Sequence, residues 1–152
     1  MIIRPLNMTD FTDALALYRE LMGDIPVAED FSAFQKLLTH DGLTIWGAEV
    51  KGAIVSMVTL HVMPNITFGS RPYALIENVV TAQRAQGTGI GRAVMEAAME
   101  AAWAENAYKI MLLTGQDSGA KGFYEKLGFT GDQKHGMIIR RAPQRRPIGS
   151  RL

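Results

Sequence analysis

Apolar residues recur every three or four positions in the first third of the chain, and this spacing predicts two amphipathic helices. The first helix begins at Thr9, a residue type that caps helix N-termini well. Its buried stripe consists of Phe11, Leu15, Tyr18 and Met22. The second helix begins after Asp30, another capping residue, and ends at Asp41-Gly42. A short apolar run over residues 1–4 predicts a strand in front of both helices.

From residue 43 onward the apolar runs are typical of strands. Residues 43–50 and 53–62 form two such runs, and the Lys51-Gly52 pair between them indicates a hairpin turn. Residues 63–72 contain two prolines and a Gly-Ser pair, so we expect a loop there. The loop leads into a central strand over residues 73–81.

The remaining elements alternate between helices and strands. An alanine-rich helix is predicted over residues 92–105, a buried strand over 108–114, a short helix over 118–127 and a last strand over 137–140. The resulting order, β-α-α-β-β-β-α-β-α-β, predicts an α/β fold with a β-α-β unit in its second half. Because no repeat or linker occurs before residue 141, residues 1–140 are expected to form one domain.

A glycine-rich bend at residues 86–91, QGTGIG, joins the central strand to the alanine-rich helix. Glycines allow close approach of a ligand to the main chain, and the first turn of a helix offers unpaired N–H groups and partial positive charge to an anion. A Walker-type loop is disfavoured because Gly91 is followed by Arg92-Ala93, and the spacing GxGxG is not the GxGxxG of dinucleotide folds. A tight turn without a ligand remains the alternative.

Two motifs carry a resemblance to a known family. Gln86-x-x-Gly89-x-Gly91 follows the central strand, and GFYEKLGF at residues 122–129 comes about thirty residues later. Both segments, in this order and at this separation, resemble the GCN5-related N-acetyltransferase (GNAT) superfamily over residues 1–140. The resemblance implies the GNAT fold, a mixed, strongly twisted sheet with helices on both faces. It also implies that acetyl-CoA lies between the strands at 73–81 and 108–114, which splay apart in that family.

The resemblance also implies which residues hold the cosubstrate. The pyrophosphate loop, acting mostly through main-chain N–H groups, comprises Gln86, Gly87, Thr88, Gly89, Ile90, Gly91 and Arg92. The main chain that pairs with the pantetheine arm comprises Val79, Val80 and Thr81. An N–H at or near Val79 faces the acetyl oxygen in that family and would stabilise an oxyanion. Asp117 or Ser118 stands where the family often has an asparagine that touches pantetheine.

The catalytic candidates are Tyr124 and Glu77. By resemblance, Tyr124 of the FYEKLGF segment lies beside the thioester sulfur, where a phenol can protonate the departing thiolate; the alternative is a packing role. Glu77, in the segment IENVV, is the candidate base for the acceptor amine, and the alternative is a structural acid paired with an arginine such as Arg71. Strand alternation predicts Glu77 and Val79 on one face and Asn78 on the other.

The segment IENVV also resembles the I-E-D-V-V segment of the glucosamine-6-phosphate N-acetyltransferase branch. Asn78 stands where that branch has aspartate, so the acceptor is left open. We expect an acetyl-CoA-dependent enzyme that acts on the primary amine of a small molecule. A protein or peptide N-acetyltransferase, a non-catalytic module that senses acyl-CoA, and a nucleotide- or NAD-binding protein are the alternatives. Many relatives dimerise, so a homodimer is an expectation by analogy.

Composition limits these possibilities further. At 152 residues, 47% hydrophobic and 20% charged, the chain has the size and balance of one globular domain. No run approaches the roughly 20 apolar residues that span a bilayer, and MIIRPLNMTD lacks the apolar core of a signal peptide. We therefore expect a cytoplasmic location and no membrane partner.

The absence of cysteine excludes disulfides, thiolate metal sites and a cysteine-linked acetyl-enzyme, which favours direct transfer in a ternary complex. Three histidines, at positions 40, 61 and 135, lack metal-ligand spacing, so no metal is expected. Residues 141–152 hold four arginines and no acid. Without them, Lys and Arg fall from 16 to 12 against 15 Asp and Glu, a net charge of −3. We expect this basic tail to be flexible, with nucleic-acid binding the less favoured interpretation.

Overall fold

A computed structural model describes residues 1–141, in two units: Met1–Leu112, and the residues from Leu113 onward. The first unit contains a five-stranded sheet whose strands lie in chain order. The strands are β1 (Ile2–Pro5), β2 (Leu43–Val50), β3 (Ala53–Met63), β4 (Tyr73–Thr81) and β5 (Ile110–Leu112). The first four are antiparallel, and β5 is parallel to β4 because α4 connects them. This mixed sheet is the predicted fold class.

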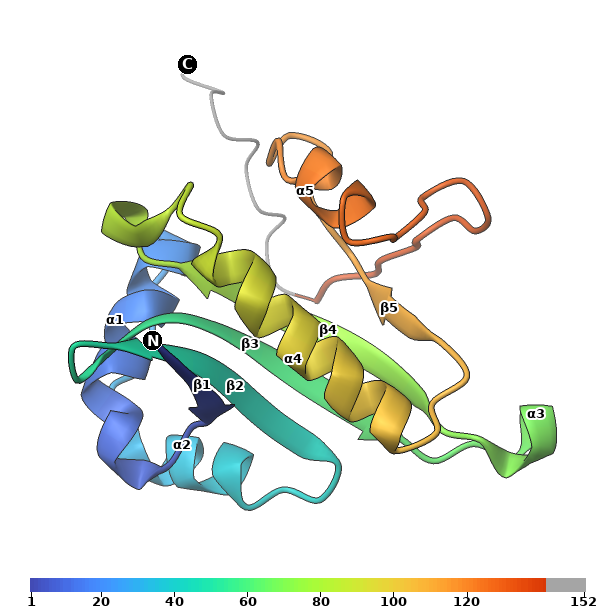
Figure 1. The fold of residues 1–152 in the computed structure, drawn as a ribbon, viewed down its shortest axis with the longest axis horizontal. Helices are drawn as coiled ribbons and strands as arrows, with labels where there is room; N and C mark the ends of the chain where they lie inside the picture. The colour runs from blue at the N-terminus through green and yellow to red at the C-terminus, as the bar shows by residue number, and fades with distance from the viewer. Residues whose placement is uncertain (142–152) are drawn as a thin grey trace. The chain divides into compact units, whose positions relative to one another are not determined.

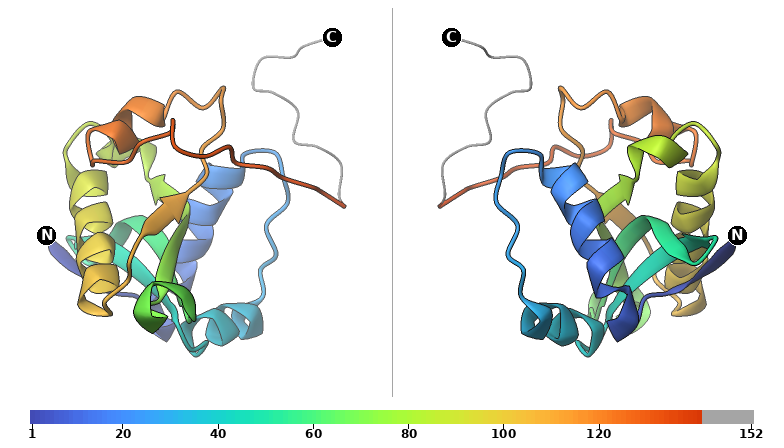
Figure 2. Two further views of the ribbon diagram at one scale, coloured as in Figure 1. Left: turned by 90° about the vertical axis from the view of Figure 1, so that its right-hand side faces the viewer. Right: turned by 90° about the vertical axis from the view of Figure 1, so that its left-hand side faces the viewer.

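Helices cover both faces of the sheet, as predicted. Figure 2 shows α1 (Phe11–Met22) and α2 (Phe31–Leu38) on one side and α4 (Ile90–Ala104) on the other. Strand β3 lies at the centre of this sandwich, and residues 54–60 are buried continuously. The shorter helical turns are η1 (Met8–Asp10), α3 (Thr67–Ser70) and η2 (Gln83–Ala85) in the first unit and α5 (Lys121–Glu125) in the second (Figure 1).

Capping explains where the first helices begin. The predicted cap at Thr9 is wrong, because Asn7 accepts the N–H of Thr9 and opens the turn η1, from which α1 continues. Asn7 and Asp10 form a reciprocal capping box, a pattern that satisfies two helix-start donors at once. Asp30 caps α2 as predicted, since its carboxylate accepts the N–H of Ala33 at 3.1 Å.

The predicted hairpin between β2 and β3 is confirmed. Lys51 and Gly52 have φ values of +52° and +79°, the pair of left-handed residues that a two-residue turn of type I′ requires. Strand β4 has the predicted limits, and α4 begins two residues earlier than predicted, at Ile90. The predicted strand at 108–114 shortens to β5, since the ladder with β4 ends at Leu112.

The end of the described chain differs from the prediction. The helix predicted at 118–127 shortens to Lys121–Glu125, and residues 137–140 form no strand. Met137 and Ile139 are 90% and 100% exposed, although their sequence pattern is strand-like. A strand exists only when its main chain pairs with a neighbour, and an apolar run alone does not supply one. Of the predicted basic tail, residues 142–152 lie outside the described part of the chain.

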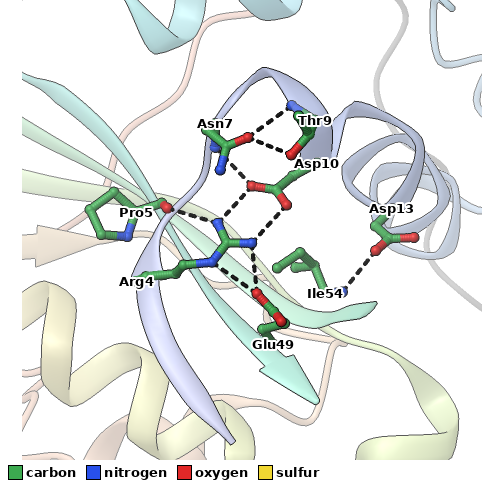
Figure 3. A network of polar contacts seen from close by, with 8 residues as sticks. All are labelled: Arg4, Pro5, Asn7, Thr9, Asp10, Asp13, Glu49 and Ile54. Atoms are coloured by element: carbon green, nitrogen blue, oxygen red, sulfur yellow. Dashed lines mark hydrogen bonds and ion pairs between the residues drawn. The ribbon is translucent and has the colours of Figure 1, made fainter. Parts of the chain in front are cut away.

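A network around Arg4 attaches the first strand to the first helical turn and to β2 (Figure 3). The Arg4 guanidinium donates to both carboxylate oxygens of Asp10, at 2.8 and 2.9 Å, and to Glu49 at 2.8 and 3.0 Å. Asp10 also accepts the N–H of Asn7 at 2.8 Å. The hydrogen bonds from Arg4 hold the pKa of Asp10 below its usual value, against the opposing effect of burial.

Asp10→Asn is expected to destabilise the chain by about 2 kcal/mol near neutral pH, because it leaves part of the Arg4 charge unpaired. A carboxylate whose pKa is depressed by folding stabilises the protein above its unfolded pKa, and this contribution is lost as the pH falls through the lower folded value. The difference between wild type and Asp10→Asn should therefore shrink below about pH 4. Urea unfolding at pH 7 and pH 3 measures it, and an equal difference at both pH values would contradict the ion-pair interpretation.

Candidate active site

Strand β4 contains a bulge in its middle. The register with β3 pairs Thr59 with Glu77 but Met57 with Val80, so β4 has one extra residue between these pairs. Asn78 lies in this interval with φ +52°, in the left-handed region. Directly paired residues of an antiparallel ladder point to the same face, and Met57 and Thr59 share a face of β3. The predicted alternation is therefore wrong: Glu77 shares its face with Val80, because the bulge shifts the phase of the strand.

Beyond the bulge, β4 continues without β5. The parallel pairing covers Ala74–Ile110 to Ile76–Leu112, and β5 ends there. In the described part of the chain, residues 77–81 of β4 have β3 as their partner strand and no β5 partner. Val79 and Thr81 are half-buried and Val80 is buried. The edge of this segment away from β3 therefore has no strand partner within Met1–Leu112.

Three polar contacts fix the segment between β4 and the glycine bend. The Glu20 carboxylate of α1 accepts the N–H of Gln83 at 2.9 Å, across 63 residues of sequence. Gln86 Nε2 donates to the Thr81 carbonyl at 3.0 Å, and the Thr88 hydroxyl donates to the Ala85 carbonyl at 2.6 Å. The side chains of Gln86 and Thr88 therefore shape the loop from within.

The glycines of the bend adopt the conformations that favour glycine. Gly87 and Gly89 have φ values of +74° and +85°, and a Cβ at either position would meet no atom within 4 Å. Gly89 is the N-cap of α4, and its cap carries no side-chain hydrogen bond. The first amides of a 15-residue helix thus follow an open glycine turn, an arrangement that suits an anion.

The other loop residues contribute differently. The side chain of Ile90 packs against the hydrophobic cluster that contains Leu17, Met57 and Val80, so only its main chain could face a ligand. Arg92 forms an exposed ion pair with Glu96 one turn along α4, at 3.1 Å. Exposed pairs of this kind contribute little to stability, so the contact of Arg92 with phosphate stays a prediction.

Glu77 is exposed, and the arginine suggested as its structural partner is engaged elsewhere. Arg71 donates to the carbonyls of Asn106 and Ala107, at 3.1 and 3.0 Å, after the end of α4. No ion pair among residues 1–141 involves Glu77. An exposed carboxylate without an ion pair is not the structural acid that the alternative requires.

Tyr124, Asp117 and Ser118 belong to the second unit. Tyr124 lies on α5, and its ring contacts the Phe129 ring edge-on, with centroids 6.2 Å apart. The Ser118 hydroxyl donates to the Gly115 carbonyl at 2.8 Å and accepts the N–H of Ala120 at 3.3 Å. Ser118 therefore builds the turn before α5, and its proposed contact with pantetheine stays a prediction.

A family model described as "Acetyltransferase (GNAT) family" matches residues 9–129, most of the chain. The chain belongs to the GNAT acetyltransferase family. A glucosamine 6-phosphate N-acetyltransferase of Trypanosoma brucei brucei is 30% identical to this acetyltransferase over 145 residues, covering 84% of this chain and 96% of the relative. The family and this relative identify the protein as an N-acetyltransferase.

Solved structures share the fold of this acetyltransferase. A putative acetyltransferase from Agrobacterium tumefaciens str. C58 is 40% identical, has a TM-score of 0.88, and is matched over 93% of this chain and 100% of its own. A glucosamine-6-phosphate N-acetyltransferase from Arabidopsis thaliana has a TM-score of 0.81 at 23% identity, covering 93% of this chain and 98% of its own. Among residues 1–141 of this acetyltransferase, no helix has the length and apolar character needed to cross a membrane.

Sequence reasoning missed two features of this acetyltransferase. Glu20, which holds the segment before the glycine loop, lies on a different element from the loop and belongs to no motif. The hydroxyls of Tyr18 and Thr59 are buried between α1 and β3, where the sequence pattern indicates only core. The helical period predicts that Tyr18 lies on the buried side of the first helix, but nothing in the sequence indicates that it contacts Thr59, 41 positions later.

Proposed function

We propose that this acetyltransferase moves an acetyl group from acetyl-CoA directly to the primary amine of a small molecule. The observation that carries the proposal is the glycine turn before α4, with Gly87 and Gly89 left-handed and open space where their side chains would lie. It stands at the end of β4, next to main chain that β5 leaves unpaired. A diphosphate at the turn and an extended pantetheine arm along residues 79–81 are the ligand parts that these features would hold.

Each step of the transfer then has a candidate residue. The amine nitrogen attacks the acetyl carbon, the new C–N bond forms, and the C–S bond breaks. Glu77 accepts a proton from the amine, and Tyr124 gives one to the departing thiolate. A main-chain N–H at or near Val79 stabilises the oxyanion between these events. Because the sequence contains no cysteine, an acetyl-cysteine intermediate cannot form, and the proposed transfer is direct.

Glucosamine 6-phosphate is the first acceptor to test, because a relative named for this activity is 30% identical. Asn78 lies in the bulge with a left-handed φ, and its neutral amide stands where that branch has aspartate. An amide donates as well as accepts hydrogen bonds, so a different polar substituent beside the amine would suit it.

The proposal is tested by an acceptor screen with acetyl-CoA, read as release of free thiol. The panel contains glucosamine 6-phosphate, glucosamine, linear diamines and a lysine-containing peptide. Saturable turnover with a small amine is the expected result, and Glu77→Gln should reduce it. Turnover with the peptide alone would assign a protein or peptide substrate instead. Tight CoA binding with no turnover on any amine would indicate a sensing module.

A further inference from the structure

Two buried hydroxyl groups lie between α1 and β3 without a hydrogen bond of regular geometry. They are the Tyr18 hydroxyl and the Thr59 hydroxyl; Thr59 is only 3% exposed, and both oxygens are shielded from solvent. The two groups interact with each other, and burial raises the pKa of Tyr18 more than Thr59 lowers it. The phenol therefore stays protonated at neutral pH and remains a donor. Buried polar groups left poorly bonded reduce stability, which calls for an explanation beyond packing.

The position of the two hydroxyl groups relative to Glu77 supplies this explanation. Thr59 is directly opposite Glu77 in the β3–β4 ladder, one residue before the bulge at Asn78. Opposite residues of an antiparallel pair have Cβ atoms about 4.5–5.5 Å apart and share a face. A glutamate carboxylate turned toward β3 can therefore reach a threonine hydroxyl across the ladder. The exposed carboxylate, the threonine and the tyrosine thus line up across three elements, from β4 through β3 to α1.

We propose that Thr59 and Tyr18 are positioning residues for Glu77: when an acceptor is bound beside Glu77, Thr59 donates a hydrogen bond to the carboxylate and Tyr18 donates one to Thr59. The proposal deepens the proposed function, since it rests on Glu77 acting as the base. The bond directs one carboxylate oxygen inward and leaves the other for the amine proton. The two hydroxyls are then satisfied in the working complex, at the place where they are poorly bonded without it.

A structural role and a positioning role predict different reaction rates for Thr59→Val, which removes the hydroxyl and keeps the shape. If the hydroxyl only fills space, its loss stabilises the chain and leaves the rate unchanged. If it positions Glu77, the chain is at least as stable, but kcat/KM for the amine falls by about tenfold, the scale of one hydrogen bond to a charged group. KM for acetyl-CoA should not change in either case. Thr59→Ser restores the hydroxyl and should recover the rate to within about twofold.

A double-mutant cycle with Glu77→Gln closes the test. Once the carboxylate is gone, Thr59→Val should lower the remaining rate by less than about twofold. Tyr18→Phe, which retains the ring, should lower kcat by about threefold through its effect on Thr59. Thr44→Val is the matched control, since Thr44 pairs with Leu60 and so lies on the opposite face of the sheet. It should leave kcat and KM unchanged.

Two outcomes overturn the proposal while leaving the proposed function intact: wild-type rates in Thr59→Val, or equal effects of Thr59→Val with and without Glu77. If Thr59→Val does not fold, Tyr18→Phe decides in its place, and a wild-type rate there has the same meaning. A wild-type chain that releases no thiol with any amine overturns the proposed function, and the positioning role with it.

Discussion

Gly89→Val is expected to abolish CoA binding, with a loss of affinity of at least about 100-fold. The main chain at Gly89 has φ +85°, a conformation that a β-branched residue adopts only with strain. A Cβ there points into open space, so valine would place its methyl groups where the diphosphate is proposed to approach the main chain. Several charge-assisted hydrogen bonds of roughly 1.5–3 kcal/mol each would be lost together. Isothermal titration with CoA measures the loss.

The control for this substitution is Gly52→Val in the β2–β3 hairpin. Gly52 has φ +79° and a Cβ there also meets no atom within 4 Å, so the backbone strain is matched while the loop is untouched. Both variants should show a similar decrease in the midpoint of thermal unfolding, and only Gly89→Val should lose affinity for CoA. Unchanged affinity in Gly89→Val would remove the glycine turn from the proposed site.

Tyr124→Phe should lower kcat by about 10- to 100-fold and leave KM for acetyl-CoA nearly unchanged. The substitution removes the proposed proton donor for the thiolate, and general acid catalysis contributes roughly 10²–10⁴-fold in favourable cases. Phenylalanine keeps the edge-on ring contacts with Phe123 and Phe129. Steady-state kinetics with varied acetyl-CoA separate the two parameters.

Tyr108→Phe is the matched control for this experiment, because Tyr108 is also a half-buried tyrosine and has no assigned role in transfer. Its ring stacks on the Phe68 ring, with the two ring centroids 4.1 Å apart. It should turn over at the wild-type rate. A Tyr124→Phe enzyme as fast as the wild type would reduce Tyr124 to a packing residue and leave protonation of the thiolate to solvent.

Most of the fold follows from local patterns in the sequence. The limits of β4 and the hairpin at Lys51-Gly52 were predictable because apolar runs and turn residues act over a few positions. The absence of a strand at residues 137–140 could not be predicted, because a strand needs a pairing partner and an apolar run does not specify one. The cap at Asn7 was missed for a similar reason: Asn7 and Thr9 are both good caps, and the bond with Asp10 selects between them.

The candidate site divides in the same way. The glycine motif indicated the turn before α4, since left-handed φ values at Gly87 and Gly89 are a local requirement. The face of Glu77 was predicted wrongly, because the bulge arises from the pairing of β4 with β3 and no single-strand pattern reports it. Thr59 became visible as a neighbour of Glu77 only through that pairing.

The left-handed conformation of Asn78 limits how this position can evolve. Asparagine, aspartate and glycine tolerate such a φ value, whereas valine and isoleucine, the residues that strands usually accumulate, do not. Drift at residue 78 is therefore confined to a few small types, two of which carry a hydrogen-bonding group. A lineage could exchange a carboxylate for an amide here, and so retune acceptor preference, while the geometry of the strand stays unaltered.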